Sequence, residues 1–154
     1  MEKREIYRQL LTQVESLIEG ETNRISVLAN VTAAVKEALA FFWVGFYLVE
    51  NDELALGPFQ GSVACYHIGY GKGVCGTAWA RRQTVVVEDV EAFPGHIACS
   101  SLSRSEIVVP LFDGNGEVAG VLDIDSTELA TFDEVDKEWL ERLCAVVSHN
   151  LYRP

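Results

Sequence analysis

The first forty residues contain two stretches in which apolar residues recur at helical spacing. The first stretch carries Ile6, Leu10, Val14, Leu17 and Ile18, and the second carries Ile25, Leu28, Thr32, Val35 and Leu39. Residues three or four positions apart lie on one face of a helix. The pattern therefore predicts two amphipathic helices, separated by the polar segment 20–23.

Three later segments are rich in aromatic and β-branched residues, which favour strands. They are residues 41–49, 105–112 and 118–125. The last two are joined by Asp113-Gly114-Asn115-Gly116, a sequence typical of a β-hairpin turn. We therefore expect three strands, of which the last two are antiparallel neighbours.

The middle of the chain has a less regular pattern. We expect short strands at 54–56, around Cys65 and at 84–87, a short helix at 74–82, and a long loop over 88–103. Near the C-terminus, Thr131 and Glu134 fit a capping box with Thr131 as the N-cap. An apolar stripe follows at helical spacing, formed by Val135, Trp139, Leu143, Val146 and Val147. These elements predict an α+β fold, in which helices pack on one sheet.

Length and charge narrow the possible functions. A chain of 154 residues has the length of one domain, which we expect to span 1–154. Its 23 Asp and Glu against 12 Lys and Arg give a net charge of −11, which disfavours nucleic acid and anionic membranes as partners. The sequence shows neither a secretory leader nor an apolar run of about 18 residues. It therefore predicts a cytoplasmic location.

The four cysteines are the next feature to explain. In a reducing compartment, a cysteine is more often free, metal-bound or redox-active than part of a structural disulfide. Cys144 falls on the apolar stripe of the last helix, which predicts a small core residue. Cys99 lies in the long loop among small and polar residues, where a reactive thiol is accessible. Cys65 and Cys75 lie on glycine-flanked segments that could bring a second sulfur within reach.

Three other kinds of site are weaker alternatives. The glycine-rich segment 69–73 lacks the spacing of a phosphate-binding loop and is better explained as a turn or a lid. A zinc site has enough candidate ligands in Cys65, His67, Cys75, His96 and Cys99, but no CxxC or HExxH spacing supports it. A serine triad would need a GxSxG motif, which the sequence lacks.

A group of carboxylates forms the second candidate site. Because side chains alternate along a strand, Asp123 and Asp125 share one face, about 7 Å apart. Glu106, on the neighbouring strand, joins them if the hairpin register allows. A solvated acidic sheet face is the plainer explanation. Clustered carboxylates, however, raise one another's pKa, so that one can hold a proton while others bind an ammonium group. Beside thiols, such a pocket suggests an amino-acid substrate and sulfur redox chemistry.

Several of these segments together resemble a known family. The stretches are 42–47 (FWVGFY), 56–61 leading into Ala64-Cys65, 73–76 (GVCG), 96–99 (HIAC), 104–110 and 120–126 (GVLDIDS). Over residues 5–152 the chain resembles a GAF domain, and specifically the single-domain free methionine-(R)-sulfoxide reductases. Three cysteines with an Asp-x-Asp strand distinguish that family from GAF domains that only bind ligands.

The resemblance implies a central antiparallel sheet with the terminal helices on one face and a loop-covered pocket on the other. It also implies reduction of free L-methionine-(R)-sulfoxide, with thioredoxin as the electron donor, no cofactor or metal, and a homodimer. By position, Cys99 is the nucleophile, Cys65 the resolving thiol and Cys75 an auxiliary or alternative relay. The substrate-binding residues implied are Glu106, Asp123 and Asp125 for the amine and sulfoxide, and Trp43 and Tyr47 around the S-methyl group.

These roles together predict a reaction mechanism. Cys99 attacks the sulfoxide sulfur while a protonated carboxyl donates to the oxygen, and the resulting sulfenic acid condenses with Cys65 to a disulfide. The alternative is a GAF sensor without catalytic activity, which binds a small molecule or responds to redox state. The acidic strand argues against a phosphate-containing ligand for such a sensor.

Overall fold

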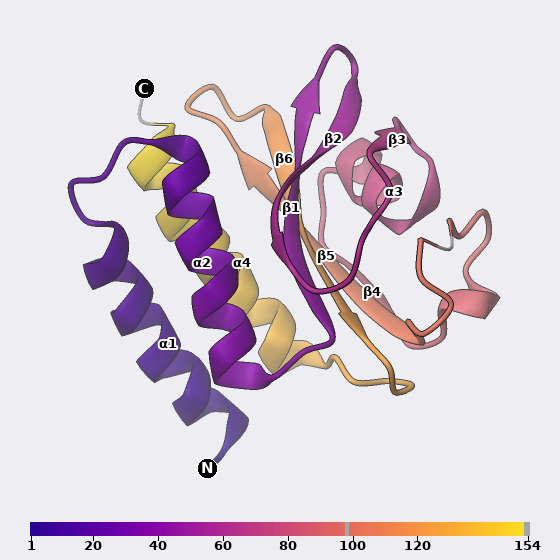
Figure 1. Cartoon of the computed structure of the whole chain (residues 1–154), viewed down its shortest axis with the longest axis horizontal. Helices are drawn as coiled ribbons and strands as arrows, with labels where there is room; N and C mark the ends of the chain where they lie inside the picture. The colour runs from indigo at the N-terminus through magenta and orange to yellow at the C-terminus, as the bar shows by residue number, and fades with distance from the viewer. Residues whose placement is uncertain (98, 153–154) are drawn as a thin grey trace.

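The structure is a computed structural model that describes residues 1–97 and 99–152. Four α-helices and six strands make up most of it (Figure 1). The helices are α1 (Lys3–Ile18), α2 (Arg24–Leu39), α3 (Gly73–Arg81) and α4 (Glu134–Leu151), with a short 3-10 helix at Val90–Ala92. The strands are β1 (Trp43–Glu50), β2 (Glu53–Gln60), β3 (His67–Gly69), β4 (Val85–Val87), β5 (Ser105–Phe112) and β6 (Val118–Ser126). The expected α+β class is thus confirmed.

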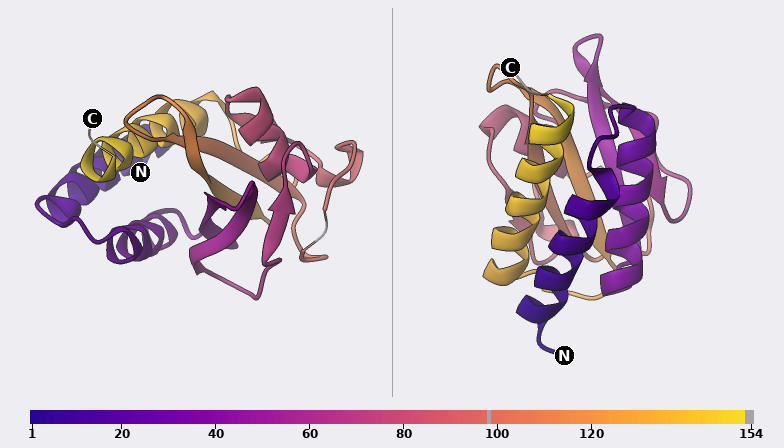
Figure 2. Two further views of the ribbon diagram at one scale, coloured as in Figure 1. Left: turned by 90° about the horizontal axis from the view of Figure 1, so that it is seen from above. Right: turned by 90° about the vertical axis from the view of Figure 1, so that its left-hand side faces the viewer.

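The six strands form one antiparallel sheet in the order β3-β2-β1-β6-β5-β4. Its centre is β6, which pairs with β1 on one side and with β5 on the other. Helices α1, α2 and α4 cover one face, while α3 and the long loop lie on the other (Figures 1 and 2). The expected arrangement of terminal helices on one face and loops on the other is therefore observed.

The two faces of the sheet bury two separate cores. The helix-side core takes Leu122 and Ile124 from β6, together with the apolar stripes of α1, α2 and α4. The smaller core on the α3 side includes Trp43, Tyr47 and Cys75. Strand alternation produces this division, because neighbouring residues of β6 point to opposite faces. Asp123 and Asp125 consequently face away from the helix-side core.

A buried carboxylate of the last helix binds two side chains of the first helix. Asp136, fully buried in the first turn of α4, accepts hydrogen bonds from Tyr7 Oη at 2.5 Å and Lys3 Nζ at 2.8 Å. Burial, followed by the charge of Asp136, raises the pKa of Tyr7. Desolvation lowers the pKa of Lys3, but its hydrogen bond and attraction to Asp136 outweigh this and raise it. Asp136 thus links the N-terminal ends of α1 and α4.

The structure corrects the predicted start of the last helix. Asp133, and not Thr131, is the N-cap of α4, and Asp136, and not Glu134, completes the capping box. The reason is local: the Thr131 hydroxyl donates to Ser126 Oγ at 2.6 Å. That hydroxyl therefore ties the loop to the end of β6, and the helix begins two residues later.

The predicted strand around Cys65 is also misplaced. The strand in this region begins at His67, and residues 61–66 form an irregular crossing loop. Two side chains of β1 hold this loop, because Trp43 Nε1 donates to Ser62 O at 2.9 Å and Tyr47 Oη donates to Cys65 O at 2.9 Å. The loop is thus held by side chains of β1, and at its end Leu56 N of β2 donates to Tyr66 O at 2.9 Å, directly before β3 begins. Within the described residues, no helix is long and apolar enough to cross a membrane.

Candidate active site

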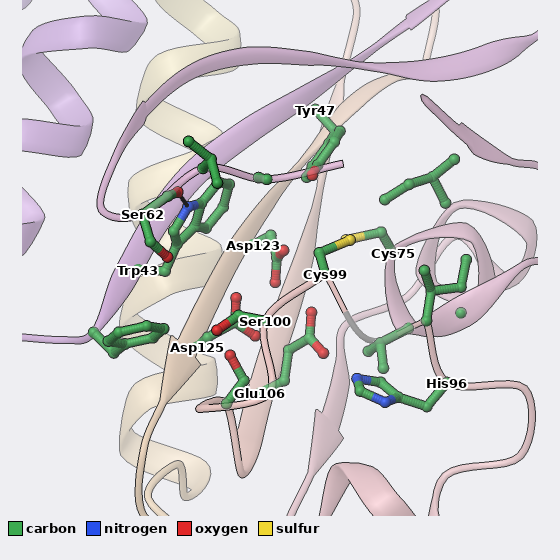
Figure 3. A pocket seen from close by; sticks show the side chains of 18 of the residues that line it. Trp43, Tyr47, Ser62, Cys75, His96, Cys99, Ser100, Glu106, Asp123 and Asp125 are labelled. Carbon is green, nitrogen blue, oxygen red and sulfur yellow. Dashed lines mark hydrogen bonds between the residues drawn. The ribbon is translucent and has the colours of Figure 1, made fainter. Parts of the chain in front are cut away.

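A pocket opens on the α3 face of the sheet, between the crossing loop 61–66 and the long loop before β5. Seven of the eight site residues expected from the sequence line it, namely Trp43, Tyr47, Cys75, Cys99, Glu106, Asp123 and Asp125, whereas Cys65 does not. Figure 3 shows the three carboxylates close together, with Trp43 and Tyr47 on one side and His96 on another. Residues more than fifty positions apart in the sequence therefore meet at one site.

The sheet register brings the carboxylates together. Glu106 of β5 is the direct cross-strand partner of Asp125 of β6, and Asp123 lies two residues along on the same face. On the other side of β6, Trp43 is the partner of Asp125 and Gly45 is the partner of Asp123. The hairpin register therefore places Glu106 on the same face as Asp123 and Asp125.

The acidic face is buried, so a solvated sheet face is the wrong description. Glu106 and Asp123 are each 6% exposed, and Asp125 is partly exposed. Burial, followed by the charges of Asp123 and Asp125, raises the pKa of Glu106 well above its usual value. Burial and the charge of Asp123 do the same to the pKa of Asp125. Burial likewise raises the pKa of Asp123. The cluster is therefore suited to holding protons near neutral pH.

One oxygen of the cluster lacks a partner. Asp123 Oδ1 is buried and has no hydrogen-bond partner among the described residues. A buried acceptor in this state costs free energy unless a donor from outside the chain reaches it. Because Asp123 lines the pocket, a ligand bearing an N–H or O–H group there would satisfy it.

A missing side chain at position 45 shapes the aromatic wall. A Cβ at Gly45 would overlap the indole ring of Trp43 and the Phe59 side chain. Glycine therefore allows the Trp43 indole to lie along β1, stacked with Phe59 at 5.2 Å and with Tyr47 at 6.1 Å between ring centroids. The result is a flat apolar surface beside the carboxylates.

Two of the three candidate redox cysteines form a disulfide. Cys65 and Cys99 are bonded, with their Cα atoms 5.5 Å apart. The bond joins the crossing loop to the long loop across 34 positions of sequence. Of the motif 96–99, Ala98 lies outside the described residues.

The third cysteine, Cys75, is a free thiol on the first turn of α3. It is buried, and desolvation together with the charges of Asp123 and Glu106 raises its pKa well above the usual value. A thiol with a raised pKa is a poor nucleophile at neutral pH. Cys144 lies in the helix-side core, as expected, and burial raises its pKa as well.

The zinc ligands considered from the sequence do not assemble. Cys65 and Cys99 are consumed by the disulfide, and His67 pairs instead with Glu53, Nδ1 to Oε1, at 2.8 Å. A different set, Cys75, Glu106 and Asp123, offers ligand atoms within 4.8 Å of one another. Metal ligands must be deprotonated, whereas the surroundings raise the pKa of all three groups. The set therefore matches a proton donor better than a metal site.

Sequence reasoning gave His96 no role other than a zinc ligand. The structure places it on the pocket wall with Cys99 and Glu106. Desolvation lowers its pKa, although the charge of Asp123 acts in the opposite direction, so the ring is mostly neutral at pH 7. The only feature of the sequence that indicated this position is that His96 lies in the same loop as Cys99.

The glycine-rich segment 69–73 is a turn, closed by Lys72 N donating to Gly69 O at 3.1 Å, and it leads directly into α3.

A sheet flanked by helices on one face, with a pocket under loops on the other, is the architecture of GAF domains. The family model described as GAF domain matches residues 21–151, and the chain belongs to that family. Within it, the chain is closely related to the free methionine-R-sulfoxide reductases.

The relatives cover nearly the whole chain. It is 49% identical to the free methionine-R-sulfoxide reductase of Escherichia coli (strain K12), over 94% of this chain and 88% of that protein. It is 56% identical to GAF domain-containing protein A of Dictyostelium discoideum, over 96% of this chain and 93% of that one. Among solved structures, the free methionine-R-sulfoxide reductase of Neisseria meningitidis in complex with its substrate superposes with a TM-score of 0.95. That protein is 55% identical, over 97% of this chain and 90% of its own.

Proposed function

We propose that this protein reduces free L-methionine-(R)-sulfoxide to L-methionine. The observation that carries the proposal is the meeting of Cys99 with a buried cluster of three carboxylates in one pocket. The relatives add support, because the Escherichia coli and Neisseria meningitidis proteins are free methionine-R-sulfoxide reductases. A cluster that holds both protons and negative charge can supply a proton and bind an ammonium group.

In the proposed reaction, the pocket first orients the amino acid. The orphaned Asp123 Oδ1 accepts a hydrogen bond from the substrate ammonium group. The flat wall of Trp43 and Tyr47 contacts the S-methyl group. The Cys99 thiolate then attacks the sulfoxide sulfur, while the Glu106–Asp125 pair, whose pKa values are raised, donates a proton to the sulfoxide oxygen.

The electrons of the cycle come from thiols. The sulfoxide oxygen passes to the sulfur of Cys99, which becomes a sulfenic acid as the sulfoxide is reduced by two electrons and methionine leaves. Cys65 then attacks the sulfenic acid sulfur, water leaves, and the Cys65–Cys99 disulfide forms. Thioredoxin returns both cysteines to thiols by thiol–disulfide exchange. The short Cα separation of this pair supports the resolving role of Cys65, with Cys75 as an auxiliary thiol.

We also propose that the chain acts as one GAF domain over 1–154, as a homodimer, in the cytoplasm. Two free buried thiols, Cys75 and Cys144, are compatible with a reducing compartment. Light scattering of the purified protein would report twice the mass of one chain if it is a dimer.

The proposal is tested by supplying reduced thioredoxin and each sulfoxide epimer separately. We expect turnover of the free (R) epimer, little turnover of the (S) epimer, and none of an N-acetylated substrate, which lacks the ammonium group. Cys99→Ser should abolish turnover, whereas Cys144→Ser, in the opposite core, should retain it. Turnover by Cys99→Ser, or none by the unmodified protein, would overturn the proposal. Absence of turnover would leave the ligand-binding GAF sensor as the alternative.

A further inference from the structure

Exposed apolar side chains flank both cysteines of the disulfide along the chain. Four of them lie within three residues of Cys65 or Cys99, and we call them the disulfide rim: Val63, Tyr66, Ile97 and Leu102. Their exposed fractions are 87%, 74%, 38% and 61%, respectively. Large apolar side chains that stay exposed together on a protein of net charge −11 mark an interaction site.

The rim is also free of charge. Residues 61–66 and 96–103, which carry it, contain no Asp, Glu, Lys or Arg, although such residues make up 23% of the chain. An apolar centre depleted of charged residues is typical of the core of a protein–protein interface. The rim therefore fits a partner that presents an apolar surface.

The position of the rim identifies the kind of partner. Both cysteines of the disulfide are partly exposed, and the disulfide joins the two loops that carry the rim. Resting on the function proposed above, each turnover leaves this disulfide to be reduced by an external dithiol. We propose that the disulfide rim is the docking surface for a protein dithiol reductant of the thioredoxin class.

The pocket also indicates which sulfur the reductant attacks. Cys99 lines the pocket, whereas Cys65 does not. The Cys65 carbonyl oxygen accepts a hydrogen bond from Tyr47 Oη. Attack by the partner thiolate on Cys65 Sγ forms a mixed disulfide and breaks the Cys65–Cys99 bond. Cys99 leaves as a thiolate inside the pocket, beside carboxyl groups able to give it a proton. The second partner thiol then attacks its own bonded sulfur and releases Cys65, so that the partner ends oxidised by two electrons.

The test begins from the oxidised protein and uses no sulfoxide. Stopped-flow measurement of disulfide reduction by bacterial thioredoxin is compared with reduction by dithiothreitol, which is too small to need a docking surface. The variants are Tyr66→Glu and Leu102→Glu, because neither residue lines the pocket, and the matched control is Ile25→Glu on α2, where Ile25 is 66% exposed. We expect each rim variant to slow reduction by thioredoxin about tenfold and to leave reduction by dithiothreitol unchanged.

Every other result counts against the proposal. Unchanged thioredoxin rates in both rim variants would remove the docking role, and equal slowing with both reductants would indicate an altered disulfide. A change in solution mass of the rim variants would assign the rim to a second copy of this chain. A single-cysteine thioredoxin should trap a mixed disulfide on Cys65, and trapping on Cys99 would overturn the order of attack. Because sulfoxide is absent, failure here is distinct from failure of the proposed reductase activity.

Discussion

Glu106 and Asp125 are direct cross-strand partners on the pocket face of the sheet. Two carboxyl groups at this spacing cannot both ionise without repulsion, and burial adds to that cost. The pair is therefore suited to holding a proton, as the proposed donation to the sulfoxide oxygen requires.

Removing either member of this pair should reduce catalysis. Glu106→Gln and Asp125→Asn keep the shape of the site but cannot supply a proton, so kcat should fall by about 10²–10⁴-fold. Steady-state assays with reduced thioredoxin and the free (R) sulfoxide measure the effect. An unchanged kcat/KM for Asp125→Asn would exclude that residue from the site.

The same substitutions should stabilise the fold at neutral pH. A carboxyl group whose pKa is raised by folding binds more protons in the folded state than in the unfolded state. The free energy of unfolding therefore falls as the pH rises above the usual pKa values, 4.5 for Glu106 and 3.8 for Asp125. Neutral Gln or Asn does not have this cost. Urea unfolding of the oxidised proteins at pH 5 and pH 8 should show a smaller loss of stability in the variants. An equal loss in all three proteins would contradict the raised pKa values.

The cysteines should separate by role. Cys65→Ser leaves Cys99 able to attack but without a thiol for the disulfide, so about one equivalent of methionine should form before turnover stops. Cys75→Ser should continue through many turnovers, because Cys75 is outside the disulfide and its pKa is raised. Product per enzyme, with mass spectrometry of Cys99, distinguishes the two. If Cys75→Ser instead stops after one equivalent, the resolving role belongs to Cys75.

The link between α1 and α4 should matter for stability and not for chemistry. Tyr7→Phe removes one hydrogen bond to the buried Asp136 and should cost about 1–2 kcal/mol of unfolding free energy. Asp136→Ala leaves the buried Tyr7 Oη without its acceptor, removes one of the two carboxylates that pair with Lys3, and should cost about 2–4 kcal/mol. Urea titration measures both, and kcat should stay within twofold. Loss of activity without loss of stability would contradict this division.

The parts of the fold governed by local pattern could be predicted from the sequence. The hairpin is an example: residues 105–112 and 118–125 were expected, and β5 (Ser105–Phe112) and β6 (Val118–Ser126) are found. The capping box was misplaced because Thr131 forms its hydrogen bond with Ser126, a tertiary choice that the motif does not encode. In the same way, residues 61–66 bond to side chains of β1 instead of forming a strand.

For the site, the sequence identified the residues but not their environment. Strand alternation predicted that Asp123 and Asp125 share one face of the sheet. The same sequence pattern is found whether that face is covered by water or by loops. Glu106 and Asp123 are buried in a pocket lined by segments distant in the sequence, an arrangement that no local pattern reveals. Pairing of Cys65 with Cys99 had rested on the resemblance alone, because spacing does not determine connectivity.

The Cys65–Cys99 disulfide also constrains the kinetics of the proposed cycle. While it is intact, Cys99 has no free thiol, so methionine sulfoxide and the reductant cannot be used in the same step. Methionine must therefore leave before the second reactant is consumed, which is double-displacement behaviour. Double-reciprocal plots at several thioredoxin concentrations should accordingly be parallel lines.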